Sequence, residues 1–390
     1  MQDHSCDVAV VGTGVVGLAA ALGCAQLGLR TTLIGPAPRT GAAGTAAFDA
    51  RVYALAPSSV ALLERLRVWQ AIDPARVEPI ARMQVFGDDG AELRFDAYGA
   101  AVERLATIVE ESALLRALEA GAGFTANLGR ITQPFDRLQI DTSRARLTLA
   151  DGAVVEARLV IAADGANSAV RAAAGLHADT VSYGQTAIVA NLAASRPHDR
   201  VAYQWFTDEG VVALLPLPGQ MVSLVWSAPE AVASELLALT DDAFAVRVTM
   251  RCASCLGTLA VRDARQSFAL RRLAVDRMVA ARLALVGDAA HVVHPLAGQG
   301  LNLGLQDVSE ILGVLGARED FRDLGDATLL RRYARARAEP VALMRLATDG
   351  LSRLFSHRGA GVRGVRNAGM ALVNRVPPLK NALIRHALGG

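Results

Sequence analysis

Cysteine is scarce in this chain of 390 residues, and its positions exclude two kinds of architecture. Cys6, Cys24, Cys252 and Cys255 are too few and too irregularly spaced for the disulfide framework of a small secreted domain. No second cysteine or histidine pair accompanies Cys252 and Cys255, so the spacing also excludes a zinc site. These two cysteines close a helix-like run over 241–256, and we interpret their spacing as incidental. We therefore expect a reduced, cytoplasmic chain.

Long uninterrupted apolar runs are absent as well. Residues 8–29 have only Thr13 and Gln26 as polar side chains, but five glycines interrupt the run. Asp3 and Asp7 stand where a signal peptide carries positive charge. A buried parallel strand followed by a buried helix has the same hydropathy as a membrane span. The run therefore predicts a strand and a helix of a large core, and neither a membrane span nor a signal peptide.

Lysine is almost missing, because Lys380 is the only one among 40 basic residues, which face 38 acids for a net charge of +2. Residues 331–390 hold eleven arginines and Lys380 against Glu339 and Asp349. That segment carries +10, which leaves −8 for the first 330 residues. Such a segment suits an anionic membrane surface or an acidic partner, or is an arginine-rich set of solvated helices. The overall charge balance alone does not identify a partner, and we expect no nucleic-acid partner.

The composition favours a well-packed globular protein, with 52% hydrophobic residues and a mean hydropathy of +0.29. Residues 7–11, 15–27 and 31–34 have the pattern of a strand, a helix and a strand, which is a βαβ unit. Residues 184–228 instead give several strands separated by proline and glycine, which indicates an antiparallel sheet. From residue 283 the α/β pattern returns. The two kinds of sheet are therefore interleaved along the chain.

Gly12, Gly14 and Gly17 form a GxGxxG pattern between the first strand and the first helix. Glycines at this spacing permit a tight turn, the close approach of a pyrophosphate and the packing of helix on strand. The pattern predicts a dinucleotide site rather than a merely well-packed turn. The acid that usually ends the second strand and binds the ribose is missing, because Gly35 stands there. We expect a Gly35→Glu substitution to tighten dinucleotide binding or to leave it unchanged.

A second glycine-rich pattern, ALVGDAAHVVHPLAGQGLNLG, covers residues 284–304. Asp288 at the end of its strand can bind sugar hydroxyls, and a glycine-rich turn that opens a helix can direct N–H groups at the negative edge of a flavin ring. Between the two patterns, Asp164 and Gly165 open the sequence DGANSAVR. Alone, that sequence is equally an ordinary turn with Ser168 as a helix cap.

These three motifs, in this order, resemble the FAD-binding signatures of the aromatic-ring flavin hydroxylases. Residues 48–55, 183–190, 294–304, 347–351 and 378–380 extend the similarity to the ubiquinone-biosynthesis hydroxylases, the UbiH/UbiF-like family, over essentially the whole chain. The resemblance implies FAD as cofactor, NAD(P)H and O₂ as co-substrates and a polyprenylated phenol as substrate. It also implies that a flavin C4a-hydroperoxide donates one oxygen atom to the aromatic ring.

The resemblance assigns roles to individual residues. It implies that Gly12, Gly14 and Gly17 hold the pyrophosphate, with Asp164 beside it. Arg51 is expected on the adenosine and pyrophosphate side, and Asp288 on the ribityl chain. The residues expected at the pyrimidine edge of the ring are Pro295, Gly298, Gly300, Leu301 and Asn302. We expect His291 and His294 to pack or to form hydrogen bonds near the flavin. The flavin itself transfers the oxygen atom, so the resemblance assigns no catalytic side chain. His294 and Pro295 are the two residues that we name as candidates for such a role.

The predicted fold is α/β with an α+β substrate domain. It combines a Rossmann-like FAD-binding domain, an interleaved antiparallel-sheet substrate domain and a C-terminal helical region. The expected boundaries are 1–75, 101–178 and 275–345 for the FAD-binding domain, 76–100 and 179–274 for the substrate domain, and 346–390 for the basic helical region.

Other functions share parts of this pattern. They are hydroxylation of a soluble aromatic compound, flavin-dependent reduction of a prenyl chain, halogenation, and a non-catalytic FAD-bound scaffold of a quinone-synthesis complex. Halogenation needs a lysine near the flavin, and Lys380 lies beyond every FAD motif, which disfavours it. A polyprenyl tail cannot diffuse through water. We therefore expect a cytoplasmic protein of bacterial type that associates peripherally with an anionic membrane, or with subunits of a quinone-synthesis complex, through its basic C-terminal region.

Overall fold

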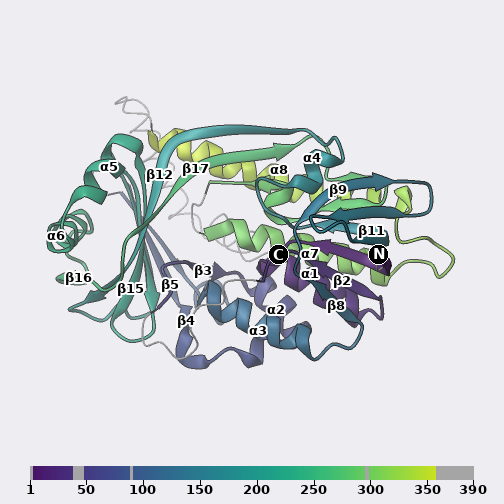
Figure 1. Cartoon of the computed structure of the whole chain (residues 1–390). Coiled ribbons are helices and arrows are strands. Elements are labelled where there is room, and N and C mark those ends of the chain that lie inside the picture. The colour runs from purple at the N-terminus through teal and green to yellow at the C-terminus, as the bar shows by residue number, and fades with distance from the viewer. Residues whose placement is uncertain (1–2, 38–47, 88–90, 295–297, 357–390) are drawn as a thin grey trace.

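The computed structural model describes residues 3–37, 48–87, 91–294 and 298–356. Two large sheets lie side by side, and the chain passes between them several times (Figure 1). Helices α1 (Val15–Gln26) and α7 (Gln299–Gly316) lie beside the sheet that holds the N-terminal strand, whereas α5 (Glu230–Ala238) and α6 (Asp241–Arg251) lie beyond the other. The predicted fold class, an α/β protein with an interleaved second sheet, is confirmed.

The first sheet has a parallel centre of strands that are apolar over consecutive residues, because both of their faces are covered. The order of its parallel strands is β19 (Leu283–Leu285), β11 (Val154–Ala162), β1 (Asp3–Val11), β2 (Thr31–Ile34) and β8 (Leu128–Ile131). Antiparallel strands extend it, namely β9 (Phe135–Ile140), β10 (Ala145–Leu149) and β18 (Val279–Ala280). The predicted strands 7–11 and 31–34 lie at the centre of this sheet.

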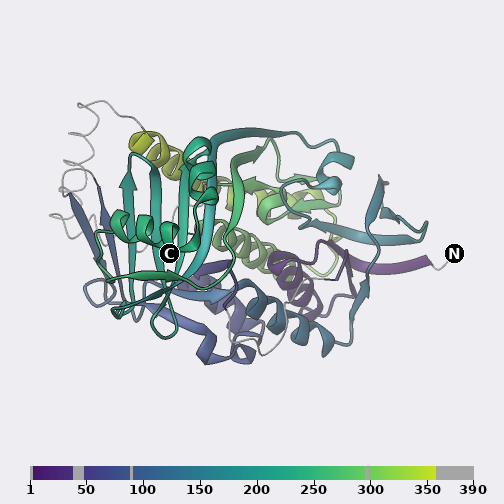
Figure 2. The ribbon, with the colours of Figure 1, turned by 60° about the vertical axis from the view of Figure 1, so that its left-hand side comes forward.

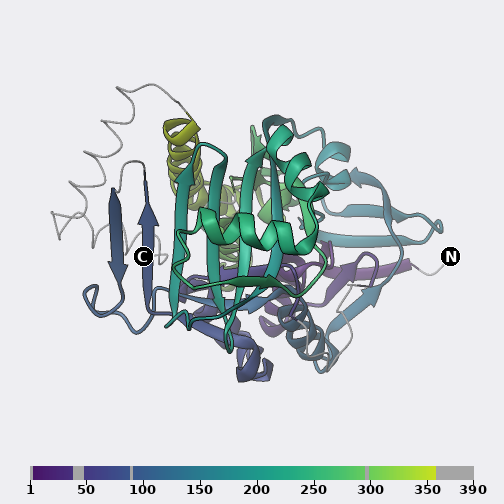
Figure 3. The same ribbon diagram turned by 90° about the vertical axis from the view of Figure 1, so that its left-hand side faces the viewer.

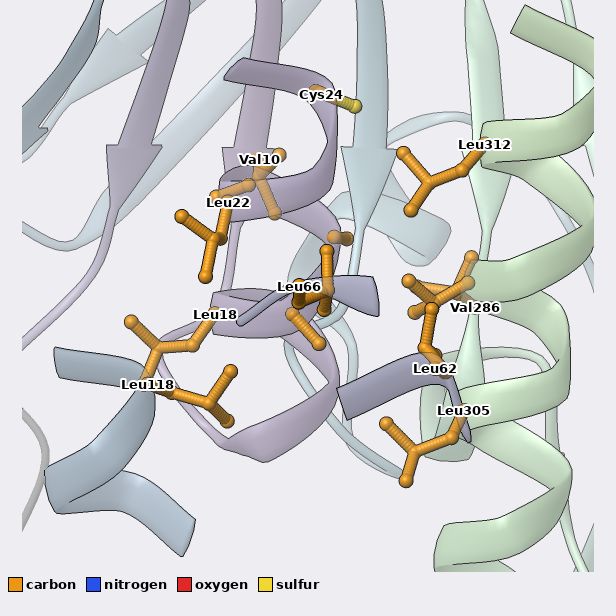
Figure 4. Close-up of a cluster of buried hydrophobic side chains, with 14 of the residues drawn as sticks. Val10, Leu18, Leu22, Cys24, Leu62, Leu66, Leu118, Val286, Leu305 and Leu312 are labelled. Atoms are coloured by element: carbon orange, nitrogen blue, oxygen red, sulfur yellow. The ribbon is translucent and has the colours of Figure 1, made fainter. Parts of the chain in front are cut away.

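Helix α1 is buried on nearly all sides rather than along one stripe. It packs between the first sheet, α3 (Glu111–Gly123) and α7, and Leu18 and Leu22 are fully buried (Figure 4). A Cβ built on Gly23 would lie 2.2 Å from Cδ1 of Leu312, so this glycine permits the close approach of α7. Because α1 is buried on nearly all sides, residues 8–29 have the hydropathy of a membrane span. Within the described residues, no helix is both long enough and apolar enough to span a bilayer.

The second sheet has nine strands. Its main order is β20 (His291–Val292), β17 (Gln266–Val275), β12 (Ala178–Ala194), β15 (Met221–Pro229), β14 (Gly210–Leu217), β13 (Val201–Thr207), β5 (Arg82–Phe86) and β6 (Glu92–Asp96), and β16 (Leu259–Val261) pairs with β12. The pairing is antiparallel except between β13 and β5, which run parallel. The parallel pair arises because β5 and β6 come from an earlier stretch of the chain and join the sheet at its edge.

Helices α5 and α6 cover one face of the second sheet (Figures 2 and 3). The strands alternate accordingly: along β14, Val212 and Leu214 point into the helix layer and are fully buried. Val211, Ala213 and Leu215 point to the opposite face and are half-buried. The face turned away from α5 and α6 is therefore apolar along this strand.

Smaller elements connect the two sheets. A three-stranded sheet consists of β3 (Val52–Leu55), β7 (Ala106–Glu110) and β4 (Val77–Ile80). The remaining helices are α2 (Pro57–Arg65), α4 (Ala169–Ala173) and the 3₁₀ turns η1 (Trp69–Ala71), η2 (Pro74–Arg76) and η4 (Gly287–Ala289). Helix α8 (Ala327–Ser356) packs on α7. The predicted boundary at 346 falls inside this single helix, and most of the basic region, including Lys380, lies outside the described residues.

The run predicted as a helix over 241–256 is shorter in the structure. Helix α6 ends at Arg251, and Ala253 and Ser254 adopt left-handed φ values of 49° and 50°. Cys252 is buried, and burial raises the pKa of Cys255 to about 11, so its thiol is protonated at neutral pH. These surroundings support the interpretation of the Cys252 and Cys255 spacing as incidental.

Candidate functional site

Four loops meet at one edge of the first sheet. Val11 of β1 pairs with Ile34 of β2 and with Ala162 of β11, and Ala162 pairs with Leu285 of β19. The carboxyl ends of these parallel strands therefore coincide. The residues that follow them directly are Gly12, Gly35, Ala163 and Val286. Ligands of open α/β sheets bind at this edge, so the fold brings all three predicted motifs to one place.

The three glycines of the first motif have different functions. A Cβ on Gly12 would lie 2.1 Å from the carbonyl oxygen of Ala163, and one on Gly17 would lie 1.9 Å from that of Gly12. These two glycines allow backbone segments to pack together. A Cβ on Gly14 would have no atom of the described residues within 4 Å apart from its own neighbours in the chain, and Gly14 opens α1 without a side-chain cap. The first N–H groups of α1 are therefore left for an anion, with room for a pyrophosphate above Gly14.

Gly35, which stands where an acid was expected, has a conformational reason to be glycine. Its φ is +143°, which is a region that residues with a Cβ rarely adopt. A Cβ there would also lie 3.2 Å from Cγ2 of Thr13, whose hydroxyl donates to the carbonyl oxygen of Pro36 at 2.6 Å. The loop after β2 is thus packed on the glycine-rich loop. The backbone conformation thus gives a reason for glycine at this position, and it reverses our expectation for Gly35→Glu.

We now expect Gly35→Glu to weaken FAD binding and to destabilise the protein by about 1–3 kcal/mol, the cost of a strained backbone conformation. Chemical unfolding of the apoprotein and titration with FAD measure the two effects. Gly152→Glu is the matched control, since Gly152 has φ +83° in a hairpin turn with open space around it. The control should lose stability while keeping wild-type FAD affinity. Tighter FAD binding by Gly35→Glu would contradict this account.

Asp288 lies in the turn that follows β19. Its side chain is accessible to solvent, yet burial among protein atoms raises the pKa of its carboxyl group above the usual value. A carboxylate that is both accessible and enclosed lines a concavity. Three basic side chains, those of His291, Arg51 and Arg271, lie close enough to oppose this rise in its pKa. No described residue donates a hydrogen bond to this carboxylate, so its oxygens are available to the hydroxyls of a ligand.

Arg51 lies between the two sheets, immediately before β3. Its guanidinium is 4.8 Å from the ring centroid of Phe268 on β17, and its Nη1 is 3.3 Å from Oε1 of Glu111. The hydroxyl of Tyr53 donates to the same oxygen at 2.8 Å. The Arg51 side chain is still 47% exposed. These contacts make Arg51 a fixed cation at the edge of the site, within the electrostatic range of Asp288, rather than an ordinary surface arginine.

Asp164 has the contacts of a helix cap. Its carboxylate accepts from the Ser168 hydroxyl at 2.5 Å and from the Val170 N–H at 3.1 Å, and Ser168 caps α4 by accepting from the Arg171 N–H at 2.9 Å. The helix-cap interpretation thus holds, and it is compatible with the other one, because the capped turn follows β11 at the edge where the other motifs lie. The adjacent Gly165 has φ +82° and open space beside it. The predicted role of Asp164 beside a pyrophosphate stays a prediction.

The start of α7 forms the last part of the site. Gly298 has φ +66° and opens the helix without a side-chain cap, and Gly300 has open space beside it. Asn302 is different, because its side chain is buried and already paired. Its Oδ1 accepts from the N–H of Ala56 and the hydroxyl of Ser59, and its Nδ2 donates to the carbonyl oxygen of Ala54, each at 2.8 Å.

This pairing limits how Asn302 can contact a flavin, and its place at the pyrimidine edge stays a prediction. Its side chain fastens α7 to the segment between β3 and α2, so only its backbone is free to face a flavin. The half-buried Leu301 is at the same end of α7. Pro295, the other residue expected there, lies outside the described residues.

His294 is buried and follows shortly after β20. Its Nε2 is 3.0 Å from Oε1 of Gln185, its ring meets that of Tyr183 edge-on at 4.8 Å between centroids, and its Nδ1 has no hydrogen-bond partner among the described residues. Burial lowers the pKa of His294 to about 4, so the imidazole is neutral at working pH. With 1% of its surface exposed, His294 has the contacts of a packing and hydrogen-bonding residue rather than of an acid–base group that touches substrate.

The neutral His294 predicts a pH dependence of stability. Between the ordinary histidine pKa of about 6.5 and the native value of about 4, the unfolded chain binds a proton that the native chain does not. Stability should therefore fall as the pH falls through this window, by about 3 kcal/mol from this residue. Urea unfolding of the wild type and of His294→Gln at pH 7 and pH 4 measures this contribution. An equal loss of stability in both proteins would contradict the assignment.

Two residues near the site were missed by the sequence reasoning. Asn191 of β12 is fully buried and donates to the carbonyl oxygens of Phe48 and Asp49, at 3.1 and 2.9 Å, which ties the segment before Arg51 to the second sheet. Glu111 holds Arg51 and Tyr53, as described above. A lone asparagine within the apolar strand 187–194 was the available signal, since buried polar side chains in strands are bonded to something specific.

The arrangement fits a flavin dinucleotide. Two helices, α1 and α7, begin with uncapped glycines at the same edge, and open space lies beside Gly14, Gly165 and Gly300. Helix N-termini suit a pyrophosphate and the electron-rich edge of a ring, and the free carboxylate of Asp288 suits ribityl hydroxyls. In the part of the chain that the structure describes, no three His, Cys, Asp or Glu side chains are grouped to hold a metal ion.

Comparison with known proteins agrees with this geometry. Residues 5–346 match the family described as FAD binding domain. The chain is 36% identical to the ubiquinone hydroxylase UbiL of Rhodospirillum rubrum, over 99% of this chain and 90% of the relative. It is 34% identical to the 3-demethoxyubiquinol 3-hydroxylase of Escherichia coli, over the full length of both chains. The crystal structure of PqsL, a probable FAD-dependent monooxygenase from Pseudomonas aeruginosa, has 22% identity and a TM-score of 0.80, over 94% of this chain and 100% of that one.

The family model spans most of the chain, and the two relatives exceed 30% identity over nearly all of it. The recognition made from the three motifs is thereby confirmed. The chain belongs to the FAD-binding family of flavoprotein monooxygenases that includes the ubiquinone-biosynthesis hydroxylases.

Proposed function

We propose that this enzyme hydroxylates the aromatic ring of a polyprenylated phenol in ubiquinone biosynthesis. The observation that carries the proposal is the full-length similarity to a 3-demethoxyubiquinol 3-hydroxylase, combined with an FAD site built from all three motifs. The reaction balances as follows: one oxygen atom of O₂ replaces a ring hydrogen as hydroxyl, the other leaves as water, and NAD(P)H supplies the two electrons. Bound FAD supplies the chemistry that accepts these electrons and activates O₂.

The protein's own residues bind and orient. The N-terminus of α1 and Gly14 would hold the pyrophosphate, Asp288 the ribityl hydroxyls, and the start of α7 at Gly298 the edge of the ring. Arg51 adds positive charge between the two sheets. His294 stays neutral, because burial lowers its pKa, and so adds no charge near the end of β20. These groups fix the flavin with respect to the second sheet.

The second sheet offers an apolar wall to the substrate. On the face turned away from α5 and α6, β14 carries Val211, Ala213 and Leu215, which are half-buried. Val225 of β15 lies beside Ala213 on the same face. Such a wall excludes water from the reacting ring and suits a hydrocarbon-bearing phenol better than a charged, soluble aromatic.

A turnover assay tests the function. The FAD-loaded enzyme is mixed with NADH or NADPH and a prenylated phenol in detergent, and NAD(P)H oxidation, O₂ uptake and the mass of the product are followed. We expect oxidation that depends on the phenol and a product that gains one oxygen atom, which carries the label when ¹⁸O₂ is used. Hydroxylation of only short, soluble phenols would favour the soluble-substrate alternative. A product with a saturated prenyl chain would indicate a reductase. If no phenol stimulates NAD(P)H oxidation by the bound flavin, the protein would instead be a non-catalytic scaffold.

We also propose a cytoplasmic, peripherally membrane-associated location. Two observations support it: the balance of +10 over residues 331–390, and two leucines of α8, Leu343 and Leu346, that are 43% and 66% exposed one turn apart. Each arginine near anionic headgroups contributes about 1 kcal/mol to the free energy of membrane binding. Exposed leucines contribute further when they become buried in the membrane interface.

Flotation with anionic and with neutral vesicles tests this location. We expect salt-sensitive binding to anionic vesicles alone. Because Thr348 is buried and Asp349 bonds Tyr183, the truncation must begin after Ser356, and removal of 357–390, which carries +6 of the +10, should then weaken binding strongly. If the full chain ignores anionic vesicles at low salt, the membrane proposal fails, and the basic region is better assigned to a subunit of a quinone-synthesis complex.

A further inference from the structure

One buried carboxylate on α7 holds the turn that carries Asp288. Asp307 is fully buried, and its Oδ2 accepts the N–H of Gly287 at 2.8 Å and lies 2.7 Å from Nε2 of His291. Gly287 begins the η4 turn, and His291 follows shortly after its end. The same oxygen therefore holds the chain on both sides of Asp288.

A buried countercharge balances this carboxylate. Nε of Arg337 on α8 donates to Oδ1 of Asp307 at 2.7 Å, and Arg337 is 5% exposed. Its Nη2 reaches the carbonyl oxygen of Leu303 at 3.3 Å. A buried carboxylate without a partner is costly, so Arg337 allows Asp307 to stay ionised and to accept hydrogen bonds at both oxygens. An ionised carboxylate cannot donate, which places the proton of His291 on Nε2.

The turn needs this support because its backbone is unusual. Gly287 has φ +59°, in the left-handed region. A Cβ on Gly287 would lie 3.2 Å from Cγ1 of Val16 on α1, so the turn is also pressed against the helix that starts the glycine-rich motif. On its other side, Nη1 of Arg171 donates to the carbonyl oxygen of Ala289 at 2.8 Å. The turn is thus fixed at its first residue, at its last and just beyond it.

We propose that Asp307 and Arg337 are positioning residues of the flavin site. Their buried ion pair sets the direction of the Asp288 side chain without touching the cofactor. Helix α8 then belongs to the FAD site, although it follows the last glycine-rich motif in the chain. The inference rests on FAD binding and not on the identity of the substrate, so its failure would leave the proposed hydroxylation untouched.

The test compares two changes of the same kind. Asp307→Asn removes the charge that holds Gly287 and His291. Asp323→Asn is the matched control, because Asp323 pairs with Arg282, which precedes β19 and thus lies at the opposite end of that strand from Asp288. For each apoprotein, the FAD Kd is measured by quenching of flavin fluorescence, the geometry of bound flavin by visible circular dichroism, and stability by urea unfolding.

We expect Asp307→Asn to raise the FAD Kd by about 10- to 100-fold, because a displaced Asp288 carboxylate loses its hydrogen bonds to the cofactor, and to change the flavin dichroism. Asp323→Asn should lose stability but keep the wild-type Kd and dichroism. If Asp307→Asn does not fold, Arg337→Gln carries the same test with an expected rise of about tenfold. A folded Asp307→Asn or Arg337→Gln with wild-type Kd and dichroism would overturn the inference. An equal rise in Kd for Asp323→Asn would overturn it too, since the effect would then be general destabilisation.

Discussion

Gly14→Ala should fold like the wild type and yet lose about 100-fold in FAD affinity, the effect of losing one or two N–H bonds to a charged group. The backbone of Gly14, at φ −72° and ψ 179°, suits any residue, and beyond its chain neighbours an added methyl group would meet no atom within 4 Å in the part of the chain that the structure describes. That methyl group would instead fill the space above the first turn of α1, where the pyrophosphate must approach the N–H groups. Unfolding of the apoprotein should be unchanged, and FAD titration should show the loss.

Gly17→Ala is the contrasting change in the same motif. Its Cβ would lie 1.9 Å from the carbonyl oxygen of Gly12, which is backbone and cannot rotate away. We expect a loss of stability of about 3 kcal/mol, the upper end of the cost of overpacking, before any ligand is added. The pair therefore separates a binding defect from a folding defect. Wild-type FAD affinity in Gly14→Ala would show that the pyrophosphate does not lie at the start of α1.

Asp288→Ala should lose most of its bound flavin while the apoprotein keeps its stability. The carboxylate accepts no hydrogen bond from the described residues, so its removal breaks nothing in the empty protein but takes away the acceptors for the ribityl hydroxyls. Hydrogen bonds to a charged group contribute about 1.5–3 kcal/mol, which is about a 10- to 150-fold rise in the FAD Kd. Flavin absorbance after gel filtration and a titration of the apoprotein measure it.

Two further variants test whether the loss of FAD affinity in Asp288→Ala is specific to this carboxylate. Asp288→Asn keeps one acceptor oxygen without the charge, so its loss of affinity should be smaller than that of alanine. Asp276→Ala removes an exposed carboxylate from the loop between β17 and β18 and should bind FAD like the wild type. An Asp288→Ala protein that retains its yellow colour with unchanged Kd would show that the motif at residues 287–288 is misassigned.

The features that could be predicted from sequence are those that local backbone chemistry decides. The strand Thr31–Ile34 is buried on both faces and was expected with the bounds that it has. Gly12 and Gly17 were expected to permit close packing, and each has a backbone carbonyl where a Cβ would be. A tight turn before a helix leaves a pattern in a few adjacent residues, which is why these roles can be read without a structure.

The features that could not be predicted depend on partners far away in the chain. Asn302 looked like a cofactor residue because of its motif, but Ala54, Ala56 and Ser59, more than 240 residues earlier, take up its side chain. Gly35 looked like a missing acid because the motif specifies only side-chain types and contains no information about the backbone angle φ. In both cases the tertiary contact or the backbone angle, rather than the local pattern, decides what the residue does.

The order in which the four loops occur along the chain bears on when the enzyme acquires its cofactor. The loops after β1, β2 and β11 precede residue 170, whereas Asp288, Gly298 and Asp307 belong to the last third of the chain. During synthesis, a nascent chain that ends before them possesses a glycine-rich loop but neither the ribityl turn nor the second helix N-terminus. Cofactor capture is then a late event in biogenesis, because contacts between distant segments form after those within them. The yellow colour of bound flavin therefore shows that the glycine-rich loop after β1 has packed against the segments that carry Asp288 and Gly298.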